Sequence, residues 1–413
     1  MFTRRLGVSV FFAAVIGVVA AAVPRSDGVA AQSPDLVVHE WGTFTSIAGP
    51  DGQAVAWRPL TGPSDLPCFV TQLNANSIKI PAGGLPGLKA MVRMETPVLY
   101  FYSPSEQTVR ATVRFPQGLI SEWYPQATVR PGTFSATTPN NINTLERIQW
   151  DNVRVTPGAK EDFPTEPDGS HYYAARETDA APVTVGGQQE KFLFYRGIAN
   201  FRPPLSATID RDGRVAVAQP TGAGIDTLIL FERRDGRMGY RVAHAEGKNI
   251  VLDRPALADN VESLREGLRG ILAREGLYPR EAAAMVETWR DSWFEDGARL
   301  FYVLSQSAVD AILPLQIEPR PATVKRVFVG RMEIVTPEIE SEVAEAMRTS
   351  NQPVLRKYGR FLEPISQMVQ QRQAAGYDQQ KADDAMKLVG AQSTKTTCSA
   401  PTAPRPSGPA SNQ

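Results

Sequence analysis

The spacing of the apolar residues changes near residue 255, and this change is the strongest constraint on the fold. Before it, the pattern is typical of strands. Residues 109–115 place Val109, Ala111, Val113 and Phe115 on one face and polar residues on the other, as in a half-buried strand. Residues 98–102 are apolar on both faces, which indicates a central strand. We therefore expect residues 32–255 to form an antiparallel β-sandwich-like domain.

Turn residues support this interpretation. Asp-Gly pairs occur at 51–52, 212–213 and 235–236, each between strand-like runs. Glycine supplies the positive φ that a tight hairpin turn needs, so these pairs predict hairpins.

Beyond residue 255, apolar residues recur at the spacing of helices, as in Val261, Leu264 and Leu268. Gly276 is expected to end this helix, and Pro279 suits the first turn of the next one. That second helix would carry Trp289 and Trp293 on its apolar stripe and end at Gly297. A further helix is expected to begin at the sequence Thr-Pro-Glu, residues 336–338. Strand-like runs also occur at 299–304 and 324–335. We therefore expect residues 256–390 to form a mixed region of helices and strands, and the whole chain to have an α+β fold.

Residues 1–31 resemble a secretory signal peptide. Arg4 and Arg5 precede an uncharged stretch from 6 to 23, and small residues surround Ala30 and Ala31. We expect cleavage there, and a periplasmic or extracellular protein with no membrane span after cleavage. An uncleaved membrane anchor is the alternative. Residues 391–413 are rich in Ser, Thr, Pro and Ala, and are expected to be a disordered tail.

Export makes a disulfide possible, and the chain has two cysteines, Cys68 and Cys398. They could pair and tie the tail to the body, or Cys68 could be a buried thiol and Cys398 a free one.

Composition excludes several classes of function. Lys+Arg and Asp+Glu are both 44, so the basic excess of a nucleic-acid binder is missing. No Gly-rich nucleotide motif, nucleophile elbow, His-Glu-x-x-His or Cys-x-x-Cys motif is present. The three histidines lie far apart in the sequence and predict no metal site, and nothing calls for a cofactor.

The segment around His39, Glu40 and Trp41 holds the first candidate residues. In a strand, His39 and Trp41 share one face and Glu40 lies on the other among apolar residues. A carboxylate there must pair with a cation or have a raised pKa. Glu40 is thus a candidate catalytic acid, or alternatively half of a buried ion pair with Arg93 or Arg196. His39 and Trp41 are candidate ligand-binding residues.

A second group of candidates surrounds the expected helix near residue 290. Trp289 and Trp293 would stack along one stripe, with Asp291 and Glu295 beside them. Aromatic surfaces beside carboxylates are used in glycoside hydrolysis. Glu95, just before the central strand, is another candidate acid. The alternative is an amphipathic helix with buried tryptophans and paired acids.

Four sequences together suggest a relationship: His-Glu-Trp-Gly-Thr-Phe-Thr-Ser at 39–46, Met-Glu-Thr-Pro-Val-Leu-Tyr-Phe-Tyr at 94–102, Arg-Asp-Ser-Trp-Phe-Glu at 290–295 and Val-Phe-Val-Gly-Arg at 327–331. They resemble those of a set of uncharacterised exported bacterial proteins. The resemblance implies bacterial export and a recurring architecture over most of the chain. It assigns no activity to any residue.

The sequence therefore leaves two alternative hypotheses for the function. The first is an exported cell-envelope binding or interaction protein, which predicts a contiguous exposed aromatic or apolar patch. The second is a hydrolase of a glycan or similar polymer that uses Glu40, Glu95, Asp291 or Glu295. It needs two of these carboxylates in one open cleft, and an arginine paired with each of them would argue against it.

Overall fold

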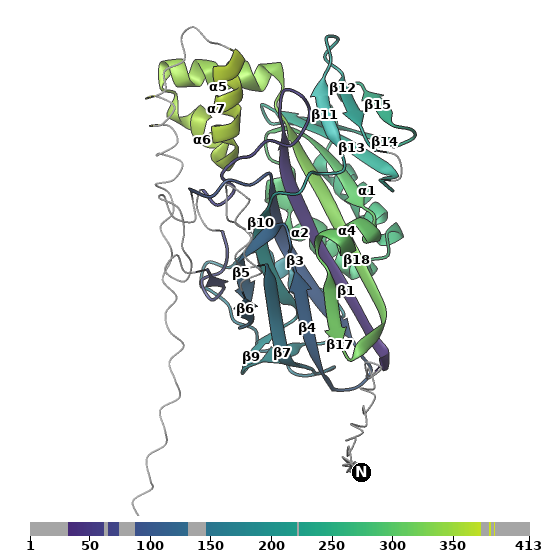
Figure 1. The fold of residues 1–413 in the computed structure, drawn as a ribbon. Coiled ribbons are helices and arrows are strands. Elements are labelled where there is room, and N and C mark those ends of the chain that lie inside the picture. Colours follow the sequence, from purple (N-terminus) through teal and green to yellow (C-terminus); the bar gives the residue numbers. More distant parts are fainter. Residues whose placement is uncertain are drawn as a thin grey trace, which may run out of the picture.

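The computed structural model describes residues 32–61, 65–73, 87–130, 146–220 and 223–372, with Gln380 and Asp384. Over these residues the largest element is a nine-stranded sheet of order β14-β13-β16-β18-β1-β3-β10-β5-β2 (Figure 1). Its strands are β1 (Gln32–Ala48), β2 (Thr71–Gln72), β3 (Val92–Tyr102), β5 (Gly118–Tyr124), β10 (Leu193–Ala199), β13 (Thr227–Arg234), β14 (Arg237–His244), β16 (Gly297–Leu304) and β18 (Arg320–Ile334).

Strand β1 lies in the middle of this sheet. It pairs in parallel with β18 and antiparallel with β3. Strands β16 and β18, which follow residue 255, lie between β13 and β1, which precede it. The two regions predicted on either side of residue 255 therefore share one sheet, because strand pairing joins segments regardless of their distance in the sequence.

Two smaller sheets pack on one face of the nine-stranded sheet. The first, of six strands, contains β17 (Leu315–Glu318), β4 (Gln107–Arg114), β7 (Arg147–Val155), β8 (Val183–Val185), β9 (Gln188–Glu190) and β6 (Thr128–Arg130). The second contains β11 (Ser206–Ile209), β12 (Val215–Ala218) and β15 (Asn249–Leu252). Phe44, Leu99 and Phe328 of the large sheet share a buried core with Val113 and Trp150. This face is sandwich-like, as predicted.

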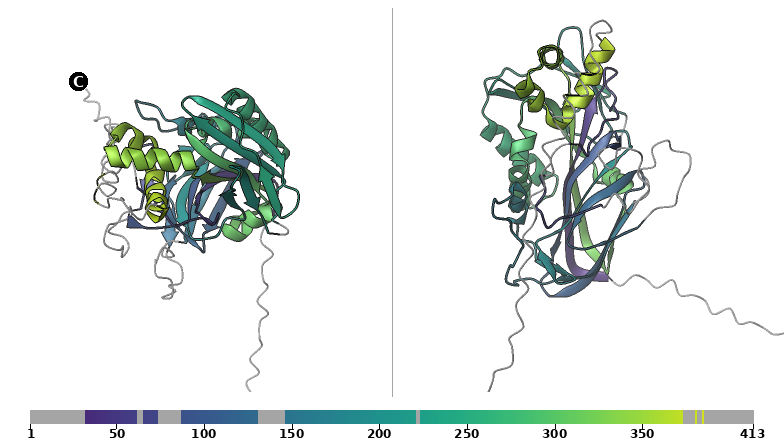
Figure 2. Two further views of the ribbon diagram at one scale, coloured as in Figure 1. Left: turned by 90° about the horizontal axis from the view of Figure 1, so that it is seen from above. Right: turned by 90° about the vertical axis from the view of Figure 1, so that its left-hand side faces the viewer.

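Helices cover the opposite face of the large sheet, as the right-hand view of Figure 2 shows. They are α1 (Val261–Arg274), α2 (Pro279–Thr288), α3 (Arg290–Trp293) and the 3₁₀ helix η3 (His171–Arg176). Leu268 and Met285 of these helices share a second core with Trp41 and Phe301 of the sheet. The predicted α+β class is thus confirmed.

A third core closes one end of the molecule, where β1 finishes (Figure 1). It contains α5 (Pro337–Thr349), α6 (Gln352–Lys357), η4 (Gly359–Phe361) and α7 (Leu362–Arg372). Ile47 of β1 and Trp57 pack against Leu362 there. The remaining helix, α4 (Gln306–Ile312), lies against β18.

Capping and turn residues in the sequence correctly predict where several helices and strands begin or end. Gly276 has φ 109° just after α1, and the side chain of Thr336 caps α5 by accepting from Ile339 N. Asp235 and Gly236 both have positive φ and join β13 to β14 as a hairpin. The expected helix end at Gly297 is wrong: α2 ends at Thr288, α3 follows, and Gly297 begins β16 with φ 129°.

Some expectations concern residues outside those described: the signal peptide at 1–31, the tail at 391–413 and Cys398. Cys68 is disulfide-bonded. Within the described part of the chain, no helix is long and apolar enough to cross a membrane.

Candidate functional site

His39 and Glu40 lie on opposite faces of β1, as the alternation predicts. The buried His39 side chain faces α2, where its Nδ1 lies 2.7 Å from Oε2 of Glu281. The same oxygen accepts a hydrogen bond from the backbone N–H of Tyr278 at the start of α2. The rings of Tyr102 and Tyr278 pack on the imidazole. His39 therefore fastens the central strand to the first turn of α2.

Glu40 is fully buried on the other face and is part of an ion pair. Arg326 of β18 donates to its Oε2 from Nε at 2.6 Å, and the hydroxyl of Tyr195 donates to its Oε1 at 2.6 Å. The expected partners Arg93 and Arg196 are wrong, because they lie on the helix-covered side of the sheet. Burial and then the Glu40 charge raise the pKa of Tyr195 well above its usual value, so this hydroxyl stays a donor. Glu40 thus links β1, β10 and β18.

The three candidate tryptophans belong to the second core. Trp41, Trp289 and Trp293 are exposed by 0%, 2% and 0%. The rings of Trp289 and Trp293 stack with an interplanar angle of 8° and centroids 6.4 Å apart. A sugar cannot stack on a face that is already covered by protein, so the structure gives these residues a packing role.

Among the described residues, no exposed aromatic patch takes their place. The large apolar side chains that are exposed in the described part of the chain are Val242, Val251 and Tyr278, which lie on β14, on β15 and just before α2. Three such side chains are too few for the contiguous patch that a binding protein was expected to carry. A ligand site must therefore be sought among enclosed polar groups.

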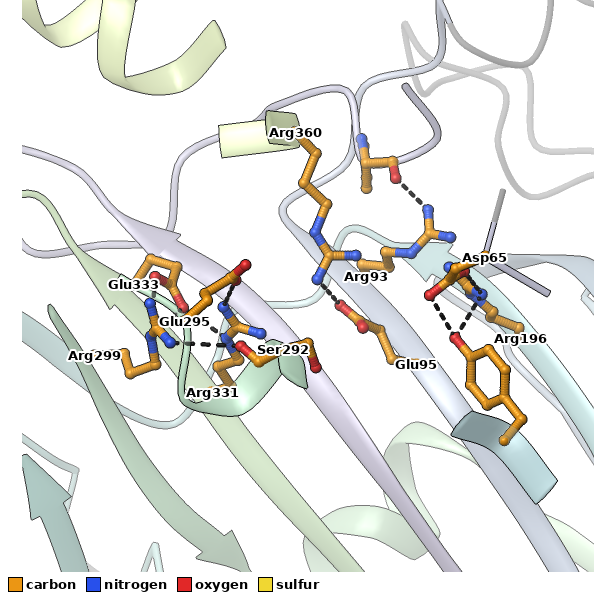
Figure 3. A network of polar contacts seen from close by, with 12 residues as sticks. Asp65, Arg93, Glu95, Arg196, Ser292, Glu295, Arg299, Arg331, Glu333 and Arg360 are labelled. Carbon is orange, nitrogen blue, oxygen red and sulfur yellow. Dashed lines mark hydrogen bonds and ion pairs between the residues drawn. The ribbon is translucent and has the colours of Figure 1, made fainter. Parts of the chain in front are cut away.

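Toward the end covered by α5–α7, the helix-covered sheet face changes from apolar to charged. On adjacent strands, Thr43 pairs with Glu95, and Thr45 lies between Arg93 and Arg331. We call this region, with the side chains that reach it, the charged zone (Figure 3). It consists of Thr43, Thr45, Asp65, Arg93, Glu95, Arg196, Glu295, Arg299, Arg331, Glu333 and Arg360.

Two of the candidate acids, Glu95 and Glu295, lie in the charged zone, and each is paired with an arginine. Arg360 donates to Glu95 at 2.7 Å, and Arg331 donates to Glu295 at 2.5 Å. The third candidate, Asp291, is exposed on α3 beside Arg290, with 3.5 Å between their atoms. Glu40 is paired with Arg326, as described above. All four carboxylates that were expected to be catalytic therefore have an arginine partner.

The electrostatic environment keeps Glu95 ionised. Burial alone raises its pKa, but the charges of Arg360, Arg93 and Arg196 outweigh burial and lower the pKa below its usual 4.5. A carboxylate with a depressed pKa stabilises the fold above the unfolded-state pKa, and this contribution is lost as the pH falls through the folded-state value.

This gives a prediction for acid stability. Wild-type protein is expected to lose stability steeply as the pH falls below about 4.5, and Glu95→Gln is expected to be less stable at pH 7 but to show a flatter pH dependence in that range. Urea unfolding between pH 7 and pH 3 measures both effects. Exposed Glu106→Gln is the control and should follow the wild type; identical slopes for Glu95→Gln and wild type would contradict the assignment.

A second ion pair in the charged zone involves Asp65, which the sequence did not indicate as a candidate. Its Oδ1 accepts from Nη1 of Arg196 at 3.1 Å, and its Oδ2 accepts from the hydroxyl of Tyr172 at 2.7 Å. Tyr172 belongs to η3, and Arg196 to β10. Partial burial raises the pKa of Asp65, but the charge of Arg196 and the Tyr172 hydrogen bond outweigh this effect and hold the pKa well below the usual range. Asp65 lies in a loop with no motif, so no local signal marks it.

Arg93 stands out because it is buried without an acidic partner. Its Nη1 donates to the carbonyl oxygen of Pro59, its Nε has no partner, and no carboxylate lies within ion-pair distance among the described residues. Burial, followed by the charge of Arg196, lowers the pKa of Arg93 to about 10. The only sequence signal for it is an arginine two residues before Glu95 in a largely apolar strand.

Several buried hydroxyls near these arginines also lack partners: Thr43, Thr45 and Thr96. Thr96 has φ 49°, a left-handed conformation that costs a β-branched residue on the order of 1–3 kcal/mol. Most buried polar groups in folded proteins are hydrogen-bonded. Unpartnered groups beside a strained residue mark this as the region of the described structure best suited to a polar ligand.

The described residues contain no group of three side chains suited to hold a metal ion. Comparison with protein-family models gives no match to this chain, and comparison with curated proteins gives none either. The function must therefore be inferred from the chemistry of the chain itself.

Proposed function

We propose that this protein is an exported binding or interaction protein of the bacterial cell envelope, located in the periplasm or outside the cell. The leader-like residues 1–31 support export. The ligand would be an envelope component or glycan held by polar groups of the charged zone, with no nucleic acid and no cofactor involved.

The observation that carries this proposal is the pairing of the four candidate acids. Glu40, Glu95, Asp291 and Glu295 are each matched with an arginine. A glycosidase needs one carboxyl group that is protonated at working pH, which requires a raised pKa. The depressed pKa of Glu95 is the opposite condition. Binding needs no such acid, so the arrangement favours binding over hydrolysis.

A combined binding and cleavage assay separates the two functions. We expect protein purified from the periplasmic fraction to gain thermal stability with at least one member of a panel of neutral oligosaccharides and peptidoglycan fragments. At a ligand concentration about 100 times Kd, the stabilisation should be about 2.7 kcal/mol. No new reducing ends should appear.

Glu295→Gln and Asp291→Asn serve as matched variants, one acid inside the zone and one exposed acid on α3. Release of reducing ends that Glu295→Gln abolishes and Asp291→Asn leaves intact would establish the hydrolase instead. Absence of both binding and cleavage over the whole panel would contradict both functions.

A further inference from the structure

The groups around Asp65 are suited to bind a carboxylate, and the Asp65 side chain itself fills that position in the structure. Two donors from different elements converge on its two oxygens: the Arg196 guanidinium and the Tyr172 hydroxyl. Arginine with a second donor is a common way for proteins to hold a carboxylate. The two donors also contact each other, with 3.3 Å between Nη1 of Arg196 and the Tyr172 oxygen. The donors thus form one preassembled unit.

The donors and their occupant differ in how firmly the fold holds them. The Arg196 side chain is 4% exposed and lies on β10, inside the large sheet. The Asp65 side chain is 48% exposed and belongs to a segment without helix or strand. The donors therefore remain in place if Asp65 moves away, whereas Asp65 can reach solvent.

An apolar cavity adjoins this contact. Its volume is about 30 Å³. The ring of Tyr172 lines it, together with Phe194 and the strained Thr96. Leu66, Pro67, Phe69 and Val70 form another wall, and they follow Asp65 directly in the chain. The two donors therefore lie next to an apolar space, and rotation of the Asp65 side chain away from them would expose them to a ligand at its edge.

The charges that face the contact are mixed. Arg93 acts electrostatically on Asp65, and no carboxylate of the described residues lies within ion-pair distance of Arg93, although Glu122 and Glu95 lie near enough to act on its charge. Glu95 is paired with Arg360, and Glu122 is the cross-strand neighbour of Arg196. If Asp65 leaves, Arg93 and Arg196 remain buried with fewer acids than bases directly around them. Buried charge without a partner is costly, so an incoming anion is favoured.

We propose that Arg196 and Tyr172 form a binding site for a small carboxylate with an apolar body, and that Asp65 occupies this site in the absence of ligand. The carboxylate would take the place of the Asp65 side chain, and its apolar body would lie against Tyr172 and Phe194. This inference rests on the proposed binding function and assigns a carboxylate-binding subsite to one part of the charged zone.

Butyrate is the probe for the test, since it carries one carboxylate on a short apolar chain. Butyramide has the same shape without the charge. Calorimetric titration at constant ionic strength should compare the wild type with Asp65→Ala, which removes the internal carboxylate, and Asp212→Ala, which removes an exposed one. If the Asp65 side chain occupies the site more than about nine-tenths of the time, it weakens the apparent affinity for butyrate by about tenfold or more.

We therefore expect Asp65→Ala to bind butyrate at least about tenfold more tightly than the wild type, and Asp212→Ala to match the wild type. Adding Tyr172→Phe to Asp65→Ala should weaken butyrate binding by about tenfold, because the phenolic donor is lost while the ring still lines the cavity. Butyramide should bind none of these proteins. Circular dichroism checks folding, and Asp65→Asn, which keeps the side-chain volume, replaces Asp65→Ala if the latter is unfolded.

Equal affinities in the wild type and the Asp65 variants, no butyrate binding by a folded Asp65 variant, or equal binding of butyramide would each overturn the inference. These outcomes leave the proposed function intact if the wild type binds an envelope fragment. Conversely, butyrate binding by Asp65→Ala supports the site even where the oligosaccharide panel gives no binding.

Discussion

Arg326→Met is expected to lower the free energy of unfolding by about 3–5 kcal/mol, because it leaves the fully buried Glu40 without a cation. Two nitrogens of Arg326 contact the Glu40 carboxylate, and Nη1 also donates to the carbonyl oxygen of Leu313 at 2.6 Å. Urea unfolding followed by circular dichroism at pH 7 measures the loss.

The double variant Glu40→Gln/Arg326→Met is the informative control. Removing both charges should restore part of the stability, since the largest cost comes from a buried charge with no partner rather than from loss of the pair. A double variant as unstable as the sum of the two single variants would mean that Glu40 and Arg326 act independently. That result would contradict the role given to the pair.

Trp293→Ala is expected to cost about 3–5 kcal/mol, because the indole is fully buried against Trp289, Phe294 and Phe301. Trp293→Phe keeps an aromatic ring and should cost clearly less. Thermal unfolding followed by circular dichroism measures both changes.

The same variants separate a packing residue from a ligand-binding one. If Trp293 acts through packing, folded Trp293→Phe should bind its envelope ligand as tightly as the wild type. A variant with wild-type stability and lost binding would restore the role in sugar stacking that the sequence suggested.

Features that depend on near neighbours in the chain were predictable from the sequence. The half-buried strand around Val109–Val113, the hairpin turn at Asp235 and the start of the helix at Thr336 all follow from short-range spacing and turn chemistry. The opposite orientations of His39 and Glu40 also follow, because side chains alternate along any strand.

Features that depend on pairing between distant segments were not predictable in this way. The partner of Glu40 lies 286 positions away, and nothing near Arg326 indicates it. Periodicity identified the apolar stripe with Trp289 and Trp293 but not what covers it, because an exposed stripe and a buried one have the same spacing. Asp65 was missed because a single acid in a loop becomes informative only once Arg196 and Tyr172 are seen beside it.

The parallel pairing of β1 with β18 has a consequence for how the chain is made. Protein synthesis proceeds from the N-terminus, so β1 is complete long before its neighbour β18 exists. The ribosome must therefore add most of the chain before the centre of the sheet can close. Contacts so distant in sequence make folding slow, and one edge of β1 has no strand partner until β18 is made. The central strand of this sheet therefore gains its second neighbour only near the end of its own translation.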